Sequence, residues 1–168
     1  MYKRIVVAVD GSEISERAIE AALPLCREMG AVMQPLYVIN QSPIEYEIPA
    51  YDPTILRNAI REEGRSVTVR AVEKMRQFGV LGSARIVDAT GFEDVAQVIV
   101  ASAVEFDADL LIMGTHGRRG FRRLMLGSVA EHALRLSRIP ILLVPAKIPI
   151  PDIGRSQVME GRAGSVRG

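Results

Sequence analysis

The chain has 168 residues, which is room for one domain around a single hydrophobic core. The charges of its 21 basic and 20 acidic side chains nearly cancel, so the protein has no overall positive field that could hold a nucleic acid. We therefore do not expect a nucleic acid as a partner, and any anion site must be local. A hydrophobic content of 48% without Trp excludes a disordered or fibrous chain.

The sequence predicts neither export nor membrane insertion. The first apolar run, residues 5–9, is too short for the core of a signal peptide and is ended by Asp10. No segment approaches the roughly 20 apolar residues that span a bilayer. The single cysteine, Cys26, can form no intramolecular disulfide, and its apolar neighbours predict a packed thiol. We therefore expect a cytoplasmic protein without membrane contact.

The first predicted strand and helix meet at a short polar turn. The apolar run before Asp10 is mostly β-branched, which is typical of a strand covered on both faces. Apolar residues then recur at helical spacing as far as Met29, with Ser12 or Asp10 placed to cap this helix and Gly30 placed to end it. Pro24 predicts a kink, because it removes one backbone donor.

The rest of the chain continues the alternation of strands and helices. A loop with three prolines follows the second strand, and the long helix after it has Gly64 as a weak point. Further strands are predicted at residues 33–39, 84–89, 109–113 and 140–144, and further helices around residues 60–78, 95–102 and 128–136.

This alternation predicts the fold class. Strand, helix and strand joined by right-handed crossovers give an α/β fold, an open five-stranded parallel sheet of order 3-2-1-4-5 with helices on both faces, Rossmann-like. Ligands of such sheets bind beyond the carboxyl ends of the strands, where the strand order reverses. The segments that follow the first and fourth strands, residues 10–12 and 114–117, are therefore the expected site.

The second of these segments is rich in glycine. It has the pattern G-x-x-G, nine residues and then G-S, built from Gly114, Gly117, Gly127 and Ser128. Glycines let backbone amides come close to phosphate oxygens, and Ser128 adds a hydroxyl at the positive end of a helix. The pattern predicts a triphosphate cradle, although the glycines can also be read as simple turns.

The other polar residues near this segment have two readings each. Asp10 is either a helix cap or a contact to the ligand or to Mg²⁺, and Ser12 is either a cap or a ligand contact. His116 could approach a phosphate, whereas His132 is read as structural. A cluster of arginines surrounds Phe121 and can bind phosphates or form a solvated surface; its members are Arg118, Arg119, Arg122 and Arg123.

Three ordered segments resemble the ATP-binding branch of the universal stress protein family. They are residues 2–12, residues 108–117 with the glycine pattern that follows, and residues 126–131 together with 140–145. The similarity spans about residues 2–146 and implies the same fold. The chain departs from the family at Glu93, two positions after Gly91, where many members have a proline.

The resemblance implies a role for each matching position. Asp10 would lie near the ribose and phosphates, and Val38 would meet the adenine through its backbone. Gly114, Gly117, Gly127 and Ser128 would hold the ribose and phosphates. The expected ATP site is completed by Val129 and Ala130, which supply amides, and by Met113 and Arg118.

The sequence thus predicts an ATP-binding regulatory protein, with ATP and Mg²⁺ as its ligands. We expect at most slow ATP hydrolysis, because no Walker lysine, nucleophile elbow or metal-ligand set is present. The alternative is a nucleotide-free dimeric adaptor of the same fold. Residues 1–146 form the expected domain and residues 147–168 a loosely ordered tail. The apolar run Ile141–Val144 would be an edge strand, and it predicts a homodimer.

Overall fold

The computed structural model describes residues 1–40, 53–89, 94–116 and 126–146. Within these ranges the elements follow one another as β1 (Arg4–Val9), α1 (Glu13–Met29), β2 (Val32–Asn40), α2 (Pro53–Phe78), β3 (Arg85–Ala89), α3 (Val95–Glu105), β4 (Leu110–Gly114), α4 (Ser128–Leu136) and β5 (Ile141–Val144). The predicted alternation is confirmed. Several expectations concern residues outside these ranges: Gly91, Glu93, Gly117, Arg118, Arg119, Phe121, Arg122, Arg123 and the tail, residues 147–168.

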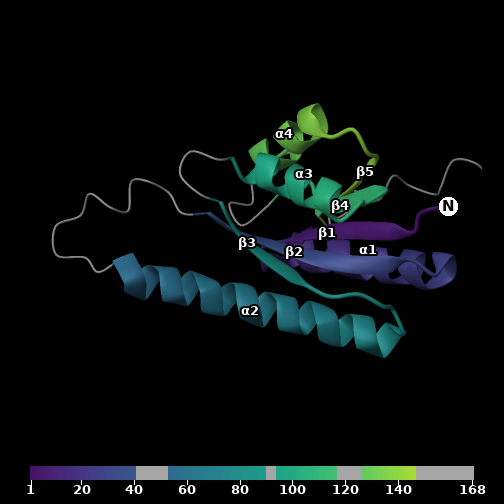
Figure 1. The fold of residues 1–168 in the computed structure, drawn as a ribbon, viewed down its shortest axis with the longest axis horizontal. Coiled ribbons are helices and arrows are strands. Elements are labelled where there is room, and N and C mark those ends of the chain that lie inside the picture. Colours follow the sequence, from purple (N-terminus) through teal and green to yellow (C-terminus); the bar gives the residue numbers. More distant parts are fainter. Residues whose placement is uncertain (41–52, 90–93, 117–125, 147–168) are drawn as a thin grey trace, which may run out of the picture.

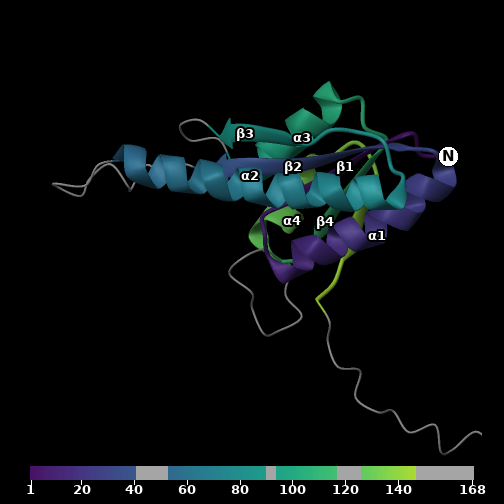
Figure 2. The same cartoon turned by 90° about the horizontal axis from the view of Figure 1, so that it is seen from below.

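The sheet has the predicted order, β3-β2-β1-β4-β5, and its registered pairs are all parallel. Helices α1 and α2 cover one face, and α3 and α4 cover the other (Figure 1). Seen from below, α1 and α2 lie side by side across the strands (Figure 2). Because the sheet is covered on both faces, β1 buries alternate residues in opposite cores: Val7 packs towards α1 and α2, and Val6 towards α3.

Helix α1 has the predicted ends. The Ser12 hydroxyl accepts a hydrogen bond from the Ser15 amide at 3.2 Å, and Gly30 adopts the left-handed conformation with φ +63°. The helix is assigned without a break through Pro24, whose side chain is exposed. Cys26 is buried, as predicted, and burial raises the pKa of its thiol to about 11.

Helix α2 differs from the sequence-based expectation in two ways. It begins at Pro53, the residue that the prediction gave to the loop, because proline is compatible with a first helical turn whose amides need no partner. Gly64 is also more than a weak point. A Cβ there would lie 2.9 Å from the ring of the buried Tyr37, so the glycine allows α2 to pack closely on β2.

Strand β5 lies at the edge of the sheet, as predicted, and its described strand partner is β4. Leu142 is 38% exposed there, whereas Val144 is buried at 8%. In the described part of the chain, every helix is too short or too polar to cross a membrane.

Candidate functional site

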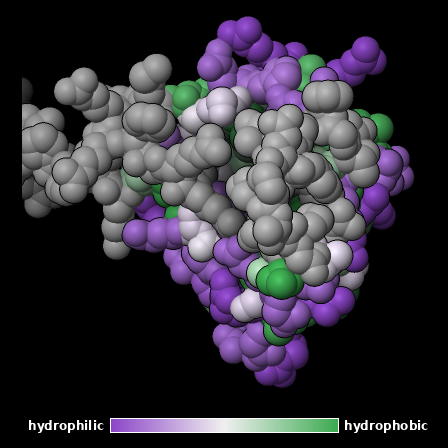
Figure 3. All heavy atoms as spheres, turned by 90° about the vertical axis from the view of Figure 1, so that its left-hand side faces the viewer, coloured by the Kyte–Doolittle hydropathy of each residue, from purple (hydrophilic) through white to green (hydrophobic). Residues whose placement is uncertain are grey.

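Two strand-to-helix corners meet at the point where the strand order reverses. The first corner joins β1 to α1, and the second lies between the end of β4 and the start of α4. Both open on the side of the sheet that is on the left in Figure 1. Figure 3 looks at this side, where most described side chains are hydrophilic. This is the side on which a ligand is predicted.

The polar groups of the first corner are hydrogen-bonded to one another. One oxygen of Asp10, Oδ1, accepts a hydrogen bond from the Ser12 amide at 3.0 Å and another from the Ser12 hydroxyl at 2.6 Å. The same hydroxyl accepts from the Ser15 amide, so Ser12 is the helix cap and Asp10 orients it. Gly11 has φ +82°, and a Cβ there would lie 3.0 Å from Val67 of α2. The capping reading is thus realised for Ser12, whereas Asp10 bonds to the cap residue and is not itself the cap.

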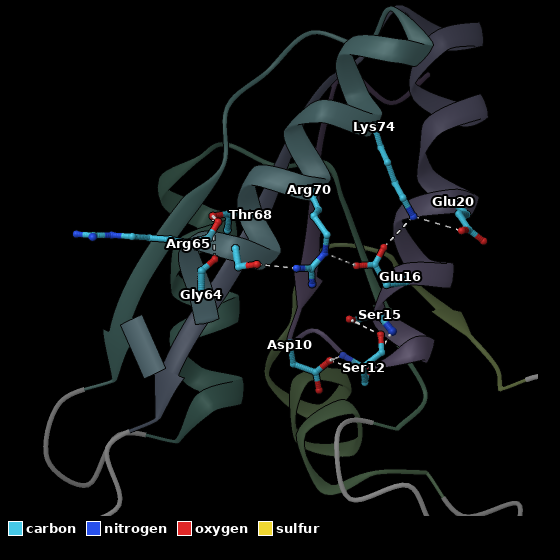
Figure 4. A network of polar contacts seen from close by, with 11 residues as sticks. Asp10, Ser12, Ser15, Glu16, Glu20, Gly64, Arg65, Thr68, Arg70 and Lys74 are labelled. Carbon is cyan, nitrogen blue, oxygen red and sulfur yellow. Dashed lines mark hydrogen bonds and ion pairs between the residues drawn. The ribbon is translucent and has the colours of Figure 1, made fainter. Parts of the chain in front are cut away.

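Ion pairs brace this corner against α2 (Figure 4). Lys74 donates to Glu16 at 2.8 Å and to Glu20 at 3.3 Å, and Arg70 lies 3.8 Å from Glu16. The hydrogen bond to Glu16 is the main cause that raises the pKa of Lys74. These ion pairs could not be predicted from the sequence, because the partners are more than 50 residues apart and share no motif.

The second corner is held by backbone hydrogen bonds, and the described residues supply no side-chain cap to α4. The Gly127 amide donates to the Thr115 carbonyl at 2.8 Å, and the Thr115 amide donates to Val144 at 2.9 Å. Gly127 is the N-cap of α4 but has no side chain that could cap it. Among the described residues, no hydrogen bond joins an acceptor to the amides of Ser128, Val129 or Ala130. The first amides of a helix have no partner within the helix and carry its positive end.

The two described glycines of the predicted loop are needed for packing inside the protein. A Cβ on Gly114 would lie 2.5 Å from Cγ2 of Ile14, a residue of α1. A Cβ on Gly127 would lie 3.1 Å from the carbonyl oxygen of Thr115 and 3.3 Å from Cα of His116. Close packing within the protein is therefore a second reason for glycine at these positions, besides the predicted approach of a phosphate, and the sequence did not reveal it.

His116 has one satisfied and one unsatisfied ring nitrogen. Its Nδ1 lies 3.0 Å from the Thr115 hydroxyl. Its Nε2 is buried and has no hydrogen-bond partner in residues 1–40, 53–89, 94–116 and 126–146. Buried polar atoms without partners are uncommon in proteins, so the unsatisfied Nε2 requires an explanation.

The structure brings Val38 and Met113 to the same end of the sheet. The last register pair between β1 and β2 joins Val9 to Tyr37, so Val38 is the first residue of β2 beyond the end of β1. The side chains of Val38 and Met113 pack in the core under α3 and α4. The Met113 side chain is buried there, and the Val38 side chain is partly buried. A backbone contact from Val38 to the adenine stays a prediction.

His132 has a partner that the spacing could not reveal. Its Nδ1 pairs with Oδ2 of Asp94, the residue that caps α3. The pair ties α4 to the start of α3, which fits the structural reading of this histidine. A hollow beside it is lined by Asp94, Ser128, Glu131, His132 and Arg135.

No group of three His, Cys, Asp or Glu residues within the described ranges could hold a metal ion. Asp10 contributes one carboxylate to the crevice. A divalent ion such as Mg²⁺ would therefore need the phosphates of a ligand as its other partners, which is a usual arrangement for this ion. The described part of the site fits a metal that enters with a nucleotide.

Known proteins share both the sequence and the fold. The profile of the "Universal stress protein family" matches residues 1–145. A universal stress protein of Methanocaldococcus jannaschii is 31% identical over 145 residues, which cover 86% of this chain and 82% of the relative.

Solved structures agree with this match. A crystal structure of a protein from the same family, from Burkholderia pseudomallei, is 41% identical, with a TM-score of 0.73 over 86% of this chain and 97% of that one. The universal stress protein of Archaeoglobus fulgidus in complex with dAMP shares the fold at 24% identity, with a TM-score of 0.61 over 85% and 98% of the two chains. The chain therefore belongs to the universal stress protein family.

Proposed function

We propose that this protein is an ATP-binding regulator that holds the nucleotide between the two corners. The observation that carries the proposal is the start of α4, which lies at the reversal of strand order and lacks a side-chain cap. Helices α1 and α3 are both capped, by Ser12 and by Asp94. An anion at α4 would satisfy donors that the other two helices satisfy internally. The complex of the Archaeoglobus fulgidus protein with dAMP supports an adenine nucleotide.

Each predicted residue has a role in this proposal. The phosphates meet the Ser128 hydroxyl and the amides of Val129 and Ala130, with Gly127 at the turn. The adenine meets the backbone at Val38, and the ribose lies near Asp10. Backbone groups of Met113 and Gly114 line the crevice, and we assign Gly117 and Arg118 to the phosphates as well. Mg²⁺, held by Asp10 and the phosphates, would neutralise phosphate charge.

The first test asks whether the protein binds ATP. The purified protein is denatured, and any released nucleotide is identified by chromatography and mass. Calorimetry with ATP and Mg²⁺ then compares the parent with Ser128→Ala. We expect the variant to bind at least several-fold more weakly, because one hydrogen bond to a charged phosphate is lost. Ser83→Ala, at an exposed serine before β3, is the matched control and should bind normally.

Gly127→Val would not test the phosphate site cleanly, although the glycine pattern suggests this variant. The nearest atoms to its Cβ belong to the backbone of Thr115 and His116, so a larger side chain would shift the protein itself. The absence of any adenine nucleotide in the purified protein, together with no calorimetric binding of ATP and Mg²⁺, would reject the proposal. The nucleotide-free adaptor would then be the better reading.

A second test concerns the metal. Asp10→Asn removes the charge but keeps an oxygen that can accept from Ser12, so the cap survives. We expect this variant to lose more affinity for ATP in the presence of Mg²⁺ than in EDTA. Equal losses in both conditions would assign Asp10 to the ribose or to the cap alone.

We also propose that the protein is a cytoplasmic homodimer. Residues 1–146 would form the domain, and residues 147–168 would be an appended tail. The dimer interface is the edge strand Ile141–Val144, paired antiparallel with the same strand of a second copy. Pro140 and Pro145 flank the strand and limit its length, because neither can donate a hydrogen bond.

Light scattering at micromolar concentration tests this dimer. Leu142→Asp should yield a monomer, because Leu142 is exposed at the edge. Val144 is buried in the core, so a charge there would damage the fold and is avoided. The control is Leu81→Asp, at an exposed leucine outside the strands, which should stay dimeric. A monomeric parent, or a dimer unaffected by Leu142→Asp, would refute this interface.

A further inference from the structure

The buried Nε2 of His116 points to a contact that the glycine pattern does not describe. This nitrogen carries either a proton or a lone pair, and either one needs a partner when it is buried. Within the described residues it has none, while Nδ1 lies 3.0 Å from the Thr115 hydroxyl. The ring is thus tethered at one nitrogen and unsatisfied at the other.

The position of His116 places it beside the proposed phosphate site. It follows β4 by two residues, and the Gly127 amide bonds to the carbonyl of the preceding Thr115. A Cβ on Gly127 would lie 3.3 Å from Cα of His116, so the backbone of His116 abuts the N-cap of α4. A phosphate at the start of α4 would therefore lie close to the backbone of this residue.

The chemistry of Thr115 selects the kind of partner. A hydroxyl can donate to Nδ1, and the proton of a neutral imidazole is then on Nε2. Phosphate oxygens only accept hydrogen bonds, so they match an Nε2–H donor. We propose that His116 donates from Nε2 to a phosphate oxygen of the bound nucleotide, and that Thr115 holds the ring in this tautomer. The inference rests on the proposed ATP binding and makes His116 a determinant of phosphate recognition.

The test compares two ligands that differ in the phosphates. Calorimetry measures ATP and adenosine binding to the parent, His116→Phe, His116→Gln and Thr115→Val. We expect His116→Phe to weaken ATP binding about tenfold or more and adenosine binding less than twofold. His116→Gln should recover part of the ATP affinity, because its side-chain amide can donate. Thr115→Val should weaken ATP selectively, and the control His132→Gln should change neither ligand.

Nitrogen NMR supplies a readout that does not depend on affinity. The chain has only two histidines, so the ring signals of His116 can be assigned with His132→Gln. We expect the tautomer with the proton on Nε2 in the parent and a mixture of tautomers in Thr115→Val.

Other outcomes overturn the proposal. Equal losses for ATP and adenosine in His116→Phe would indicate a ribose or base contact, or a structural role if the melting temperature also falls. Unchanged ATP affinity in that variant, or a proton on Nδ1 in the parent, would refute the phosphate contact while ATP binding stands. A parent that binds neither ligand would refute both proposals, and that result is distinct from the others.

Discussion

The two corners that frame the crevice use their polar groups in opposite ways. At the first corner, Asp10, Ser12 and the start of α1 bond to one another. At the second corner, α4 begins without a side-chain cap, and His116 has a buried nitrogen without a described partner. The difference teaches that a polar residue at the end of a strand need not contact a ligand, because its hydrogen bonds can be made within the protein. The unsatisfied corner is the better candidate for the main binding determinants, and the satisfied one for a rigid wall.

The largest effect is expected where the two corners touch. Gly114→Ala would place a Cβ 2.5 Å from Ile14 of α1, and overpacking of this kind costs about 1–3 kcal/mol in the free energy of unfolding. Urea denaturation measures the loss. Ile14→Ala in the same chain should reduce the additional cost of Gly114→Ala, because it removes the nearest atom. A Gly114→Ala variant as stable as the parent would show that the corners are not packed as described.

A smaller effect should separate the two serines. Ser12→Ala removes the cap of α1 and should cost about 1 kcal/mol, measured by thermal or urea unfolding without nucleotide. Ser128→Ala removes an exposed hydroxyl and should change stability by less than about 0.5 kcal/mol. If both variants lose the same stability without ligand, the contrast between a capped and an open corner is wrong.

The smallest effect concerns the brace behind the first corner. Lys74→Met should cost at most about 1 kcal/mol near pH 8, because the ion pairs to Glu16 and Glu20 are partly exposed. The pKa of Lys74 is raised in the folded state, so this contribution is complete below the ordinary lysine value of 10.5 and is lost as pH rises through the raised value.

Urea denaturation of the parent and the variant at pH 8 and at pH 11 or above checks this dependence. The difference between the two proteins should shrink at the higher pH. A constant difference across this range would mean that Lys74 stabilises the protein by packing and not by its charge.

Local patterns in the sequence were sufficient to predict the order of the elements, and with it the place of the candidate site, which stays a prediction. Ser12 and Gly30 mark the ends of α1 because caps depend on a few adjacent residues. The crevice follows from strand order, which the alternation of elements largely dictates. These features need no knowledge of which side chains meet across the molecule.

The contacts between distant elements could not be predicted in the same way. Gly64 meets Tyr37, and Gly114 meets Ile14, only because of how the helices sit on the sheet. Helix propensity alone makes Gly64 a defect, whereas packing makes it necessary. The pairing of Asp94 with His132 likewise joins residues 38 apart with no shared motif. The sequence pattern therefore predicted where a site would lie, but it did not show which of the polar groups there are already satisfied.

The central place of β1 has a consequence for the synthesis of the chain. Strand β1 is made long before β4, which is one of its two neighbours in the sheet. Lys3 and Asp109, which directly precede these two strands and are hydrogen-bonded to each other, are 106 residues apart. At translation rates of about 5–20 residues per second, one edge of β1 waits on the order of ten seconds for its partner. An apolar strand with a free edge can pair wrongly during that time. The nascent chain is therefore most exposed to aggregation before the second half of the sheet has been made.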